Sequence, residues 1–189
     1  MEKFLKKHWT NILFGVLVLL MIIPQTRVPI QVFVQRLISF SPSETSEEKR
    51  QSLEDYRWTL LTMDSEEINF SQSKGKVAII NFWATWCPPC IAEMPSFQKL
   101  YDDYGFKVDF YFVTSEKPDR VIRFLDKNDY SFPVFIQHFE APEQLQSAVL
   151  PTTYVITKNG KIAINETGVA DWNSKKIRNL LDKLLEAEN

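Results

Sequence analysis

The chain has 189 residues, of which 44% are hydrophobic and 13% aromatic, enough for one domain with a core and an additional segment. A formal net charge of -2, from 22 basic and 24 acidic residues, excludes a large basic face, so we expect no nucleic acid partner. The only histidines, His8 and His138, lie far in sequence from the two cysteines, so a four-ligand zinc site would need carboxylates or a second chain, and we expect neither a metal nor a cofactor.

The first 27 residues have the pattern of a membrane segment. Lys3, Lys6 and Lys7 precede an apolar stretch, and a helix over Trp9–Ile23 would be roughly 22 Å long against a hydrocarbon core of about 30 Å. That length also suits a cleaved signal peptide, but no small-x-small triplet follows directly. We therefore predict that residues 1–27 form an uncleaved, single-pass signal anchor in the cytoplasmic (inner) membrane. The lysines place the N-terminus in the cytoplasm and the rest of the chain on the periplasmic, extracytoplasmic side.

Residues 28–52 form a second segment between this anchor and the predicted domain. Val28–Phe40 is apolar with near-helical spacing, and two interpretations stay open: it lies along the membrane surface, or it covers an apolar patch of the domain. Ser41–Asp55 is polar and charged, which is typical of a linker. We place the domain boundary near Ser52, so that residues 53–189 form the domain.

Within the domain, short strands alternate with helices, which predicts an α/β fold. Two apolar runs have the composition of buried parallel strands, and the last helix has leucines on one face. The dipeptide Asn159-Gly160 predicts a hairpin turn with positive φ. The predicted strands are 57–62, 66–70, 77–83, 108–114, 133–136, 152–157 and 161–167, and the predicted helices are 89–104, 119–128, 142–148 and 174–186.

Both cysteines lie in Trp86-Cys87-Pro88-Pro89-Cys90, between a buried strand and a helix. Two thiols separated by two residues can form and break a disulfide, and a helix that begins between them favours a thiolate on the first. A purely structural disulfide is disfavoured because so small a loop removes little entropy from the unfolded chain. The pair therefore predicts thiol-disulfide exchange. We expect Cys87 to attack the substrate and Cys90, which is more buried, to resolve the mixed disulfide.

The chain resembles the TlpA/ResA-type membrane-anchored thioredoxin-fold oxidoreductases over about Tyr56–Leu185. The resemblance implies a thioredoxin-like fold with a central mixed β-sheet flanked by helices, and a cis Pro151 beside the disulfide. It also implies reduction or exchange of protein disulfides outside the cytoplasmic membrane, often in cytochrome c maturation. The residues that carry it are Asn81 to Cys90, then Glu93 and Pro95, then Leu150-Pro151-Thr152, then Lys158-Asn159-Gly160, and Gly168.

Other residues around the cysteines receive specific expectations. Glu93, three residues after Cys90 and on the same helix face, is a candidate for accepting the proton of Cys90. Ordinary thioredoxins carry a buried aspartate where this chain has Asn81, which cannot take up a proton, and Glu116 is a second, weaker candidate. The residues expected to contact substrate are Trp86, Pro88, Pro89, Leu150 and Pro151.

The direction of exchange follows less directly from the sequence. A domain anchored in an oxidising compartment needs a supply of electrons to reduce anything, so the reductant interpretation requires a membrane thiol donor as partner, besides protein thiols and disulfides as substrates. Three alternatives stay open: a disulfide-donating oxidant, a binding module in which the cysteines only register the redox state, and a peroxide reductase. The second cysteine favours dithiol exchange over the last.

Overall fold

The computed structural model describes residues 2–187. Met1, Glu188 and Asn189, the outermost residues of the predicted first and last segments, lie outside the described residues, as do the side chains of Lys3, Lys6 and Lys7 on which the predicted orientation depends. The described helices are α1 (Glu2–Ile22), α2 (Pro24–Ile38), α3 (Pro88–Tyr104), α4 (Pro118–Asn128) and α5 (Lys175–Glu186). Three short 3-10 helices cover Glu47–Lys49, Phe70–Ser73 and Glu143–Leu145.

The strands of the described chain form one mixed, seven-stranded sheet in the order β2-β1-β5-β4-β3-β6-β7. The central strands β3, β4 and β5 are parallel, and β6 pairs antiparallel with β3, so that Phe82 at the end of β3 lies opposite Thr152 at the start of β6. This register brings the chain before α3 and the chain before β6 to one edge of the sheet. The strands are β1 (Thr59–Leu61), β2 (Glu67–Asn69), β3 (Ala78–Phe82), β4 (Asp109–Thr114), β5 (Val134–Gln137), β6 (Thr152–Ile156) and β7 (Ile162–Thr167).

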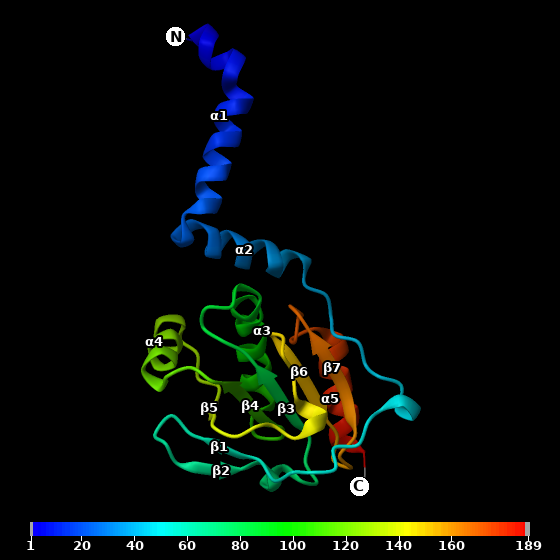
Figure 1. Cartoon of the computed structure of the whole chain (residues 1–189). Helices are drawn as coiled ribbons and strands as arrows, with labels where there is room; N and C mark the ends of the chain where they lie inside the picture. Colours follow the sequence, from blue (N-terminus) through cyan, green and yellow to red (C-terminus); the bar gives the residue numbers. More distant parts are fainter. Residues whose placement is uncertain (1, 188–189) are drawn as a thin grey trace.

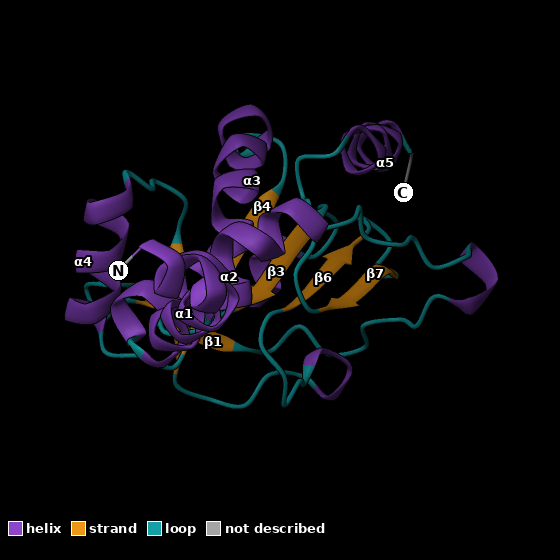
Figure 2. Ribbon diagram, turned by 90° about the horizontal axis from the view of Figure 1, so that it is seen from above, coloured by secondary structure: helices purple, strands orange, loops and turns teal. Residues whose placement is uncertain are grey.

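Both faces of the sheet are buried, which explains why β3 and β6 contain only buried residues. Helices α3 and α5 cover one face (Figure 2). Their residues Phe97 and Leu181 pack there among the strand side chains. The other face is covered by chain segments without long helices, including Trp58 and Leu145. We call residues 53–187 the sheet domain.

Most predicted elements are present within one or two residues, and Gly160 has the predicted positive φ of 76°. The helix predicted over 142–148 is wrong for most of its length, because only Glu143–Leu145 is helical. The backbone becomes extended at Gln146, whose carbonyl accepts a hydrogen bond from the Tyr154 hydroxyl at 3.1 Å. The chain leaves the helix there because it must return to the start of β6.

The predicted linker follows the outer edge of β7. The Thr45 amide donates to the Ala163 carbonyl and the Leu53 amide to the Gly160 carbonyl, both at 2.8 Å. The Ile162 amide donates in turn to the Gln51 carbonyl at 2.9 Å. Residues 40–53, here called the edge segment, are therefore attached along the sheet domain. The division of the chain at Ser52 itself stays a prediction.

Helices α1 and α2 lie at the end of the sheet domain where α3 begins, and α1 extends away from it (Figure 1). Helix α1 ends at Ile22 and a proline begins α2. Such a residue favours the first turn of a new helix over the continuation of an old one. Among the described residues, no helix is by itself both long and apolar enough to cross a bilayer, and only the pair His8–Leu20 and Gln25–Ile38, bent by 96°, meets that measure jointly.

Candidate active site

The two cysteines form a disulfide at the start of α3, with their Cα atoms 5.3 Å apart. Cys87 is the residue that caps the helix, and its sulfur accepts a hydrogen bond from the Cys90 amide at 3.3 Å. Free amide groups at a helix start stabilise negative charge, so the geometry suits a thiolate at Cys87. Both residues are buried in the oxidised state, Cys87 at 4% exposure and Cys90 at 0%. The order of exposure matches the prediction, although Cys87 is less open than we expected.

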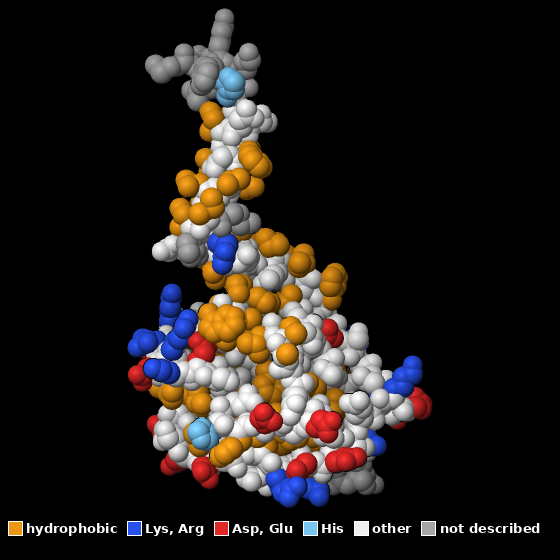
Figure 3. Space-filling model, in the orientation of Figure 1, with side chains coloured by type: hydrophobic (Ala, Val, Ile, Leu, Met, Phe, Trp, Pro, Cys, Tyr) orange, Lys and Arg blue, Asp and Glu red, His pale blue; other side chains and the backbone are white. Residues whose placement is uncertain are grey.

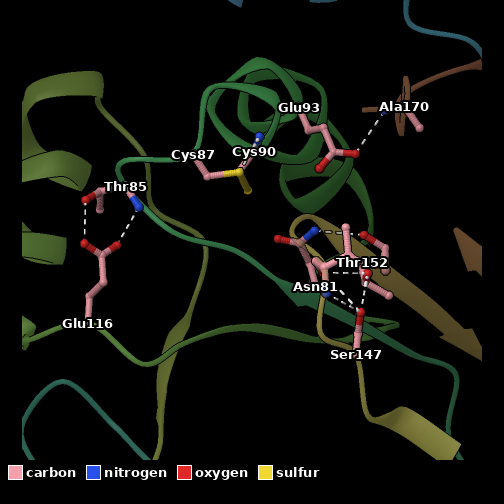
Figure 4. Close-up of a disulfide and its surroundings, with 11 residues drawn as sticks. Asn81, Thr85, Cys87, Cys90, Glu93, Glu116, Ser147, Thr152 and Ala170 are labelled. Atoms are coloured by element: carbon pink, nitrogen blue, oxygen red, sulfur yellow. Dashed lines mark hydrogen bonds between the residues drawn. A yellow bond between two sulfur atoms is a disulfide. The ribbon is translucent and has the colours of Figure 1, made fainter. Parts of the chain in front are cut away.

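Glu93 lies one turn after Cys90, where its carboxyl group is enclosed by the protein. Its Oε1 atom accepts a hydrogen bond from the Ala170 amide at 3.0 Å (Figure 4). The same atom accepts a second one from the indole N–H of Trp172 at 2.8 Å. Its Oε2 atom is buried and has no hydrogen-bond partner among the described residues. One oxygen therefore accepts two donors, and the other is the natural position for a proton.

Burial raises the pKa of Glu93 from its ordinary value of 4.5 to about 8, because the charged form loses its hydration. The hydrogen bonds from Trp172 and Ala170 favour the carboxylate and oppose this rise, and the nearby charge of Glu166 adds to it. At neutral pH the carboxyl group is therefore mostly protonated. With a pKa of about 8, the carboxyl group can both give up and take up a proton near neutral pH.

A cis peptide bond joins Leu150 and Pro151, as the resemblance implied. It directly precedes β6, at the edge of the sheet where β3 leads into the cysteine loop. Behind it, the Asn81 side-chain amide donates to the Thr153 hydroxyl at 2.8 Å, and the oxygen of the Asn81 amide is buried without a partner among the described residues. Asn81 thus occupies a buried position next to the site without being able to titrate.

The residues expected to contact substrate differ in how far they are accessible. The Trp86 side chain is 60% exposed, whereas Pro88, Pro89 and Leu150 are half-buried and Pro151 is buried. Val149 next to them is 54% exposed. The sheet register places the cysteine loop, with Trp86, and the chain before β6, with Leu150 and Pro151, at the same edge of the sheet. We call this edge the active-site edge. An apolar rim of this kind can pack against an extended partner chain, but the contact itself stays a prediction.

Glu116 fixes the loop that carries the cysteines. Its carboxylate accepts hydrogen bonds from both the Thr85 amide, at 2.5 Å, and the Thr85 hydroxyl, at 2.9 Å, two residues before Cys87 (Figure 4). Arg120 also contacts this carboxylate at 3.0 Å, and the Glu116 side chain is only 11% exposed. The structure therefore connects Glu116 to the position of the loop, although the sequence suggested it as a weaker base.

We expect Glu116→Ala to lower the free energy of unfolding of the oxidised protein by about 1–3 kcal/mol. The change removes two charge-assisted hydrogen bonds and leaves the half-buried Thr85 donors without their acceptor. Urea unfolding monitored by tryptophan fluorescence measures the change, with Glu143→Ala, an exposed carboxylate on a 3-10 helix, as the control. A Glu116→Ala protein whose free energy of unfolding equals that of the control would contradict the role of Glu116 in holding the loop.

No sequence pattern indicated Ala170 and Trp172, the two hydrogen-bond donors to Glu93. They lie 77 and 79 residues after it, and no motif connects them to the cysteines. Only the fold, which places the chain after β7 against α3, brings them to the carboxyl group. Within residues 2–187 no three His, Cys, Asp or Glu side chains gather in a way that could hold a metal ion.

Comparison with known proteins gives one family and a consistent set of relatives. The AhpC/TSA family model matches residues 52–164. The thioredoxin-like protein YneN of Bacillus subtilis is 32% identical over 148 residues, which cover 76% of this chain and 85% of that protein. The sporulation thiol-disulfide oxidoreductase A of the same organism is 28% identical over 145 residues, 74% of this chain and 87% of the relative. The thiol-disulfide oxidoreductase ResA of Oceanobacillus iheyensis is 39% identical over 103 residues, about half of each chain at 53% and 54%.

Solved structures agree with this result. A thiol:disulfide interchange protein DsbE from Chlorobium tepidum aligns with 72% of this chain and 97% of its own, with a TM-score of 0.60 and 21% identity, which establishes the likeness of fold alone. StoA from Bacillus subtilis aligns with 66% of this chain and 93% of its own, with a TM-score of 0.52 and 27% identity. The sheet domain is accordingly thioredoxin-like.

Proposed function

Because the chain belongs to the AhpC/TSA family and is a thiol-disulfide oxidoreductase of the ResA/StoA type, we propose that it reduces protein disulfides on the outer side of the cytoplasmic membrane. The observation that carries the proposal is the disulfide at the start of α3 with the buried, protonated Glu93 one turn later. This arrangement supplies both a stabilised thiolate and a proton store for one reaction cycle.

The reductive half of the cycle begins with the reduced pair. The Cys87 thiolate attacks one sulfur of a substrate disulfide, forming a mixed disulfide and releasing the other substrate sulfur as a thiolate. Cys90 then attacks the Cys87 sulfur, which re-forms the Cys87–Cys90 disulfide and frees the second substrate thiol. Two electrons pass from the protein to the substrate. The proton of the Cys90 thiol goes to the Glu93 carboxylate as Cys90 becomes the nucleophile.

Recovery of the reduced pair runs in the opposite sense. A donor thiolate attacks the Cys87 sulfur, and Cys90 leaves as a thiolate in an enclosed place where its charge is costly. The Glu93 carboxyl group, protonated at neutral pH in the oxidised state, gives its proton to this leaving sulfur. A second attack by the donor on the mixed disulfide frees Cys87. Glu93 therefore returns to the carboxylate that the reductive half requires.

Substrate recognition is proposed for the active-site edge. Trp86 and Leu150 would pack against the segment that flanks the substrate disulfide. Pro88 and Pro89 would contact the substrate beside the Cys87 sulfur. The resemblance to the TlpA/ResA type implies that the backbone next to Pro151 pairs with an extended substrate strand. Because these contacts are mainly apolar and backbone in kind, they suit many disulfide-bearing partners.

The proposal includes the predicted organisation of the chain: an anchor over residues 1–27, a juxtamembrane segment over 28–52 and the redox domain over 53–189. Support comes from the apolar side chains of α1, which have few protein neighbours to cover them. Lysines 3, 6 and 7 favour an N-terminus in the cytoplasm. The exposed side chains of α1 include Trp9, Leu13, Phe14, Leu17, Leu19 and Ile22, at 56% to 68%.

A reductant outside the cytoplasm needs an electron supply, and we propose a membrane protein with a thiol pair as the donor. The resemblance to the TlpA/ResA type makes the cysteine pairs of unfolded c-type cytochromes the first substrate class to test. The alternative direction, disulfide donation, uses the same residues and differs only in the reduction potential of the pair.

We expect a reduction potential of about -250 mV or lower for the Cys87–Cys90 pair, in the range of reducing proteins of this fold. The measurement equilibrates the full chain in detergent with dithiothreitol buffers and quantifies free Cys87 and Cys90 by alkylation and mass spectrometry. A value near about -120 mV would make the protein a disulfide donor and contradict the proposed direction.

A further inference from the structure

Helix α2 presents two different faces. On the inner face, Val32 is buried against the sheet domain at 8% exposure, and the neighbouring Val28, Gln31 and Gln35 are half-buried. The Arg36 guanidinium reaches the Ile91 carbonyl on α3 at 3.5 Å, one residue after Cys90. This face is therefore anchored to the helix that carries the disulfide.

The outer face of α2, pointing away from the sheet domain, is apolar and open. Phe33 is 63% exposed and Leu37 70%, with Val34 and Ile38 beside them at 47% and 57%. Phe40 directly after the helix is 81% exposed. Figure 3 shows these hydrophobic side chains continuing along the helix toward those of α1. A soluble domain seldom leaves so many adjacent large apolar side chains uncovered without a partner.

The bend between the helices decides which partner can reach this face. The stretches His8–Leu20 and Gln25–Ile38 meet at 96°, so that α2 runs nearly perpendicular to α1. The Thr26 hydroxyl has two carbonyl acceptors at the bend, Leu20 at 2.5 Å and Ile23 at 3.0 Å. Helix α1 leaves on the side of α2 opposite the sheet domain (Figure 1). If α1 runs along the membrane normal, α2 lies in the membrane plane with its open face toward the lipid.

We propose that α2 is an interfacial helix, lying at the boundary between lipid head groups and acyl chains and holding the active-site edge beside the membrane surface. The proposal rests on the proposed anchor in α1 and commits to a phospholipid surface as the occupant of the outer face. Amphipathic helices bind membranes in this way when large apolar side chains face the acyl region. The inner face packs on protein instead of facing water, which is what distinguishes α2 from a free amphipathic helix.

The distribution of charge fits an anionic surface. The sequence contains no Asp or Glu from Lys3 to Ser43, whereas Arg27 and Arg36 belong to α2 itself. Basic side chains also gather over α4 (Figure 3), where the exposed Lys117, Arg120, Arg123 and Lys127 outnumber the exposed Asp119 and Asp126. Basic residues close to an anionic membrane are attracted to its surface. The apolar face thus has cationic neighbours and no acidic ones within its own segment.

This placement narrows the class of partner. Since Ile91, which α2 contacts, follows Cys90 directly, the disulfide cannot move far from the membrane while α2 stays in the interface. A thiol donor must then present its reacting pair at the level of the lipid head groups. A donor with thiols deep in the bilayer could not reach Cys87, nor could one whose thiols extend far into the aqueous phase.

Spin labels measure the position of α2 directly. The full chain, with Cys87→Ser and Cys90→Ser, carries one new cysteine at Phe33 or Leu37 and is reconstituted into phosphatidylglycerol–phosphatidylethanolamine vesicles. We expect labels at both positions to collide with oxygen and to be shielded from an aqueous nickel chelate. A label at Lys74, exposed on the loop before β3, serves as the aqueous control and should show the reverse. Equal nickel accessibility at positions 33, 37 and 74 would overturn the proposal.

Further measurements distinguish the position of α2 from the proposed anchor in α1 and from a protein contact at the outer face. Alkaline carbonate extraction tests the anchor alone: release of the chain with shielding retained would contradict α1 as an anchor and leave α2 in the interface. Retention of the chain without shielding would contradict the position of α2 and leave the anchor. Shielding that requires a second membrane protein in the vesicles would identify the outer face as a protein contact and overturn the lipid assignment. In the spin-labelled chain, Leu37→Gln together with Ile38→Gln should remove the shielding at position 33. In the chain that keeps Cys87 and Cys90, the same two changes should leave the reduction potential unchanged.

Discussion

Replacing Cys87 with serine is expected to lower the turnover of disulfide reduction by about three orders of magnitude or more. The chain has two cysteines, and the remaining one, Cys90, has no exposed surface in the oxidised state. No other side chain can form the mixed disulfide with substrate. The assay follows reduction of a fluorescent disulfide peptide by the full chain in detergent, with dithiothreitol as the electron source.

The matched variant Cys90→Ser should behave differently. The Cys87 thiolate can still attack, but nothing resolves the product, so the mixed disulfide accumulates and is visible by non-reducing electrophoresis and intact mass. A protein that merely bound its partners would retain them in both variants without a covalent link. Turnover by Cys87→Ser close to that of the unmodified chain would contradict the assignment of Cys87 as the nucleophile.

Glu93→Gln is expected to remove a pH dependence of stability. The folded state raises the pKa of Glu93 from 4.5 to about 8, so between these values the folded protein holds a proton that the unfolded chain has released. The stabilisation is therefore complete below pH 4.5 and is lost as the pH rises toward 8, by about 1.4 kcal/mol per pH unit. Urea unfolding of the oxidised full chain at pH 5, 6, 7 and 8 should show this slope, and the glutamine variant should lack it.

The same substitution tests the role of Glu93 in exchange. Glutamine retains an oxygen for the donors Ala170 and Trp172, so the fold should survive, but it can neither supply nor accept a proton. We expect reduction of the Cys87–Cys90 disulfide by dithiothreitol to slow by about a hundredfold, with loss of the inflection near pH 8. Glu140→Gln, a change at an exposed carboxylate, is the control. A rate and pH profile equal to the control would leave Glu93 with a structural role only.

The sequence predicted those parts of the site that lie within one stretch of chain. The strand, the cysteines and Glu93 on the face of Cys90 are connected by local rules of strand and helix, and the structure has them in that arrangement. The cis bond before Pro151 is confirmed as well, although only the resemblance implied it. What could not be predicted is what surrounds Glu93, because its burial depends on Ala170 and Trp172, whose positions follow from the packing of the whole sheet.

Helix α2 illustrates a second limit. Thirteen residues of mixed pattern left two interpretations of Val28–Phe40 open, and sequence periodicity could not separate them. In the structure, Val32 faces protein while Phe33 and Leu37 face outward, so covering the domain accounts for only one side of the helix. A periodicity test assumes that the buried face is the apolar one, and it fails when a helix packs a mixed face on protein and leaves its apolar face outward.

The edge segment, residues 40–53, determines how freely the active site can travel. A loose chain of that length would let the domain move by about 20 Å relative to the proposed anchor in α1. Here the backbone of Thr45, Gln51 and Leu53 is hydrogen-bonded along β7. The edge segment therefore adds little to the distance over which the domain can move. With so little freedom, the disulfide would stay within a narrow range of distances from the proposed anchor. Thiols within that range would experience a high effective concentration of the disulfide. Thiols elsewhere, even abundant ones, would rarely meet it, so with the proposed anchor the selectivity for partners would arise from the length of the edge segment as well as from the surface of the site.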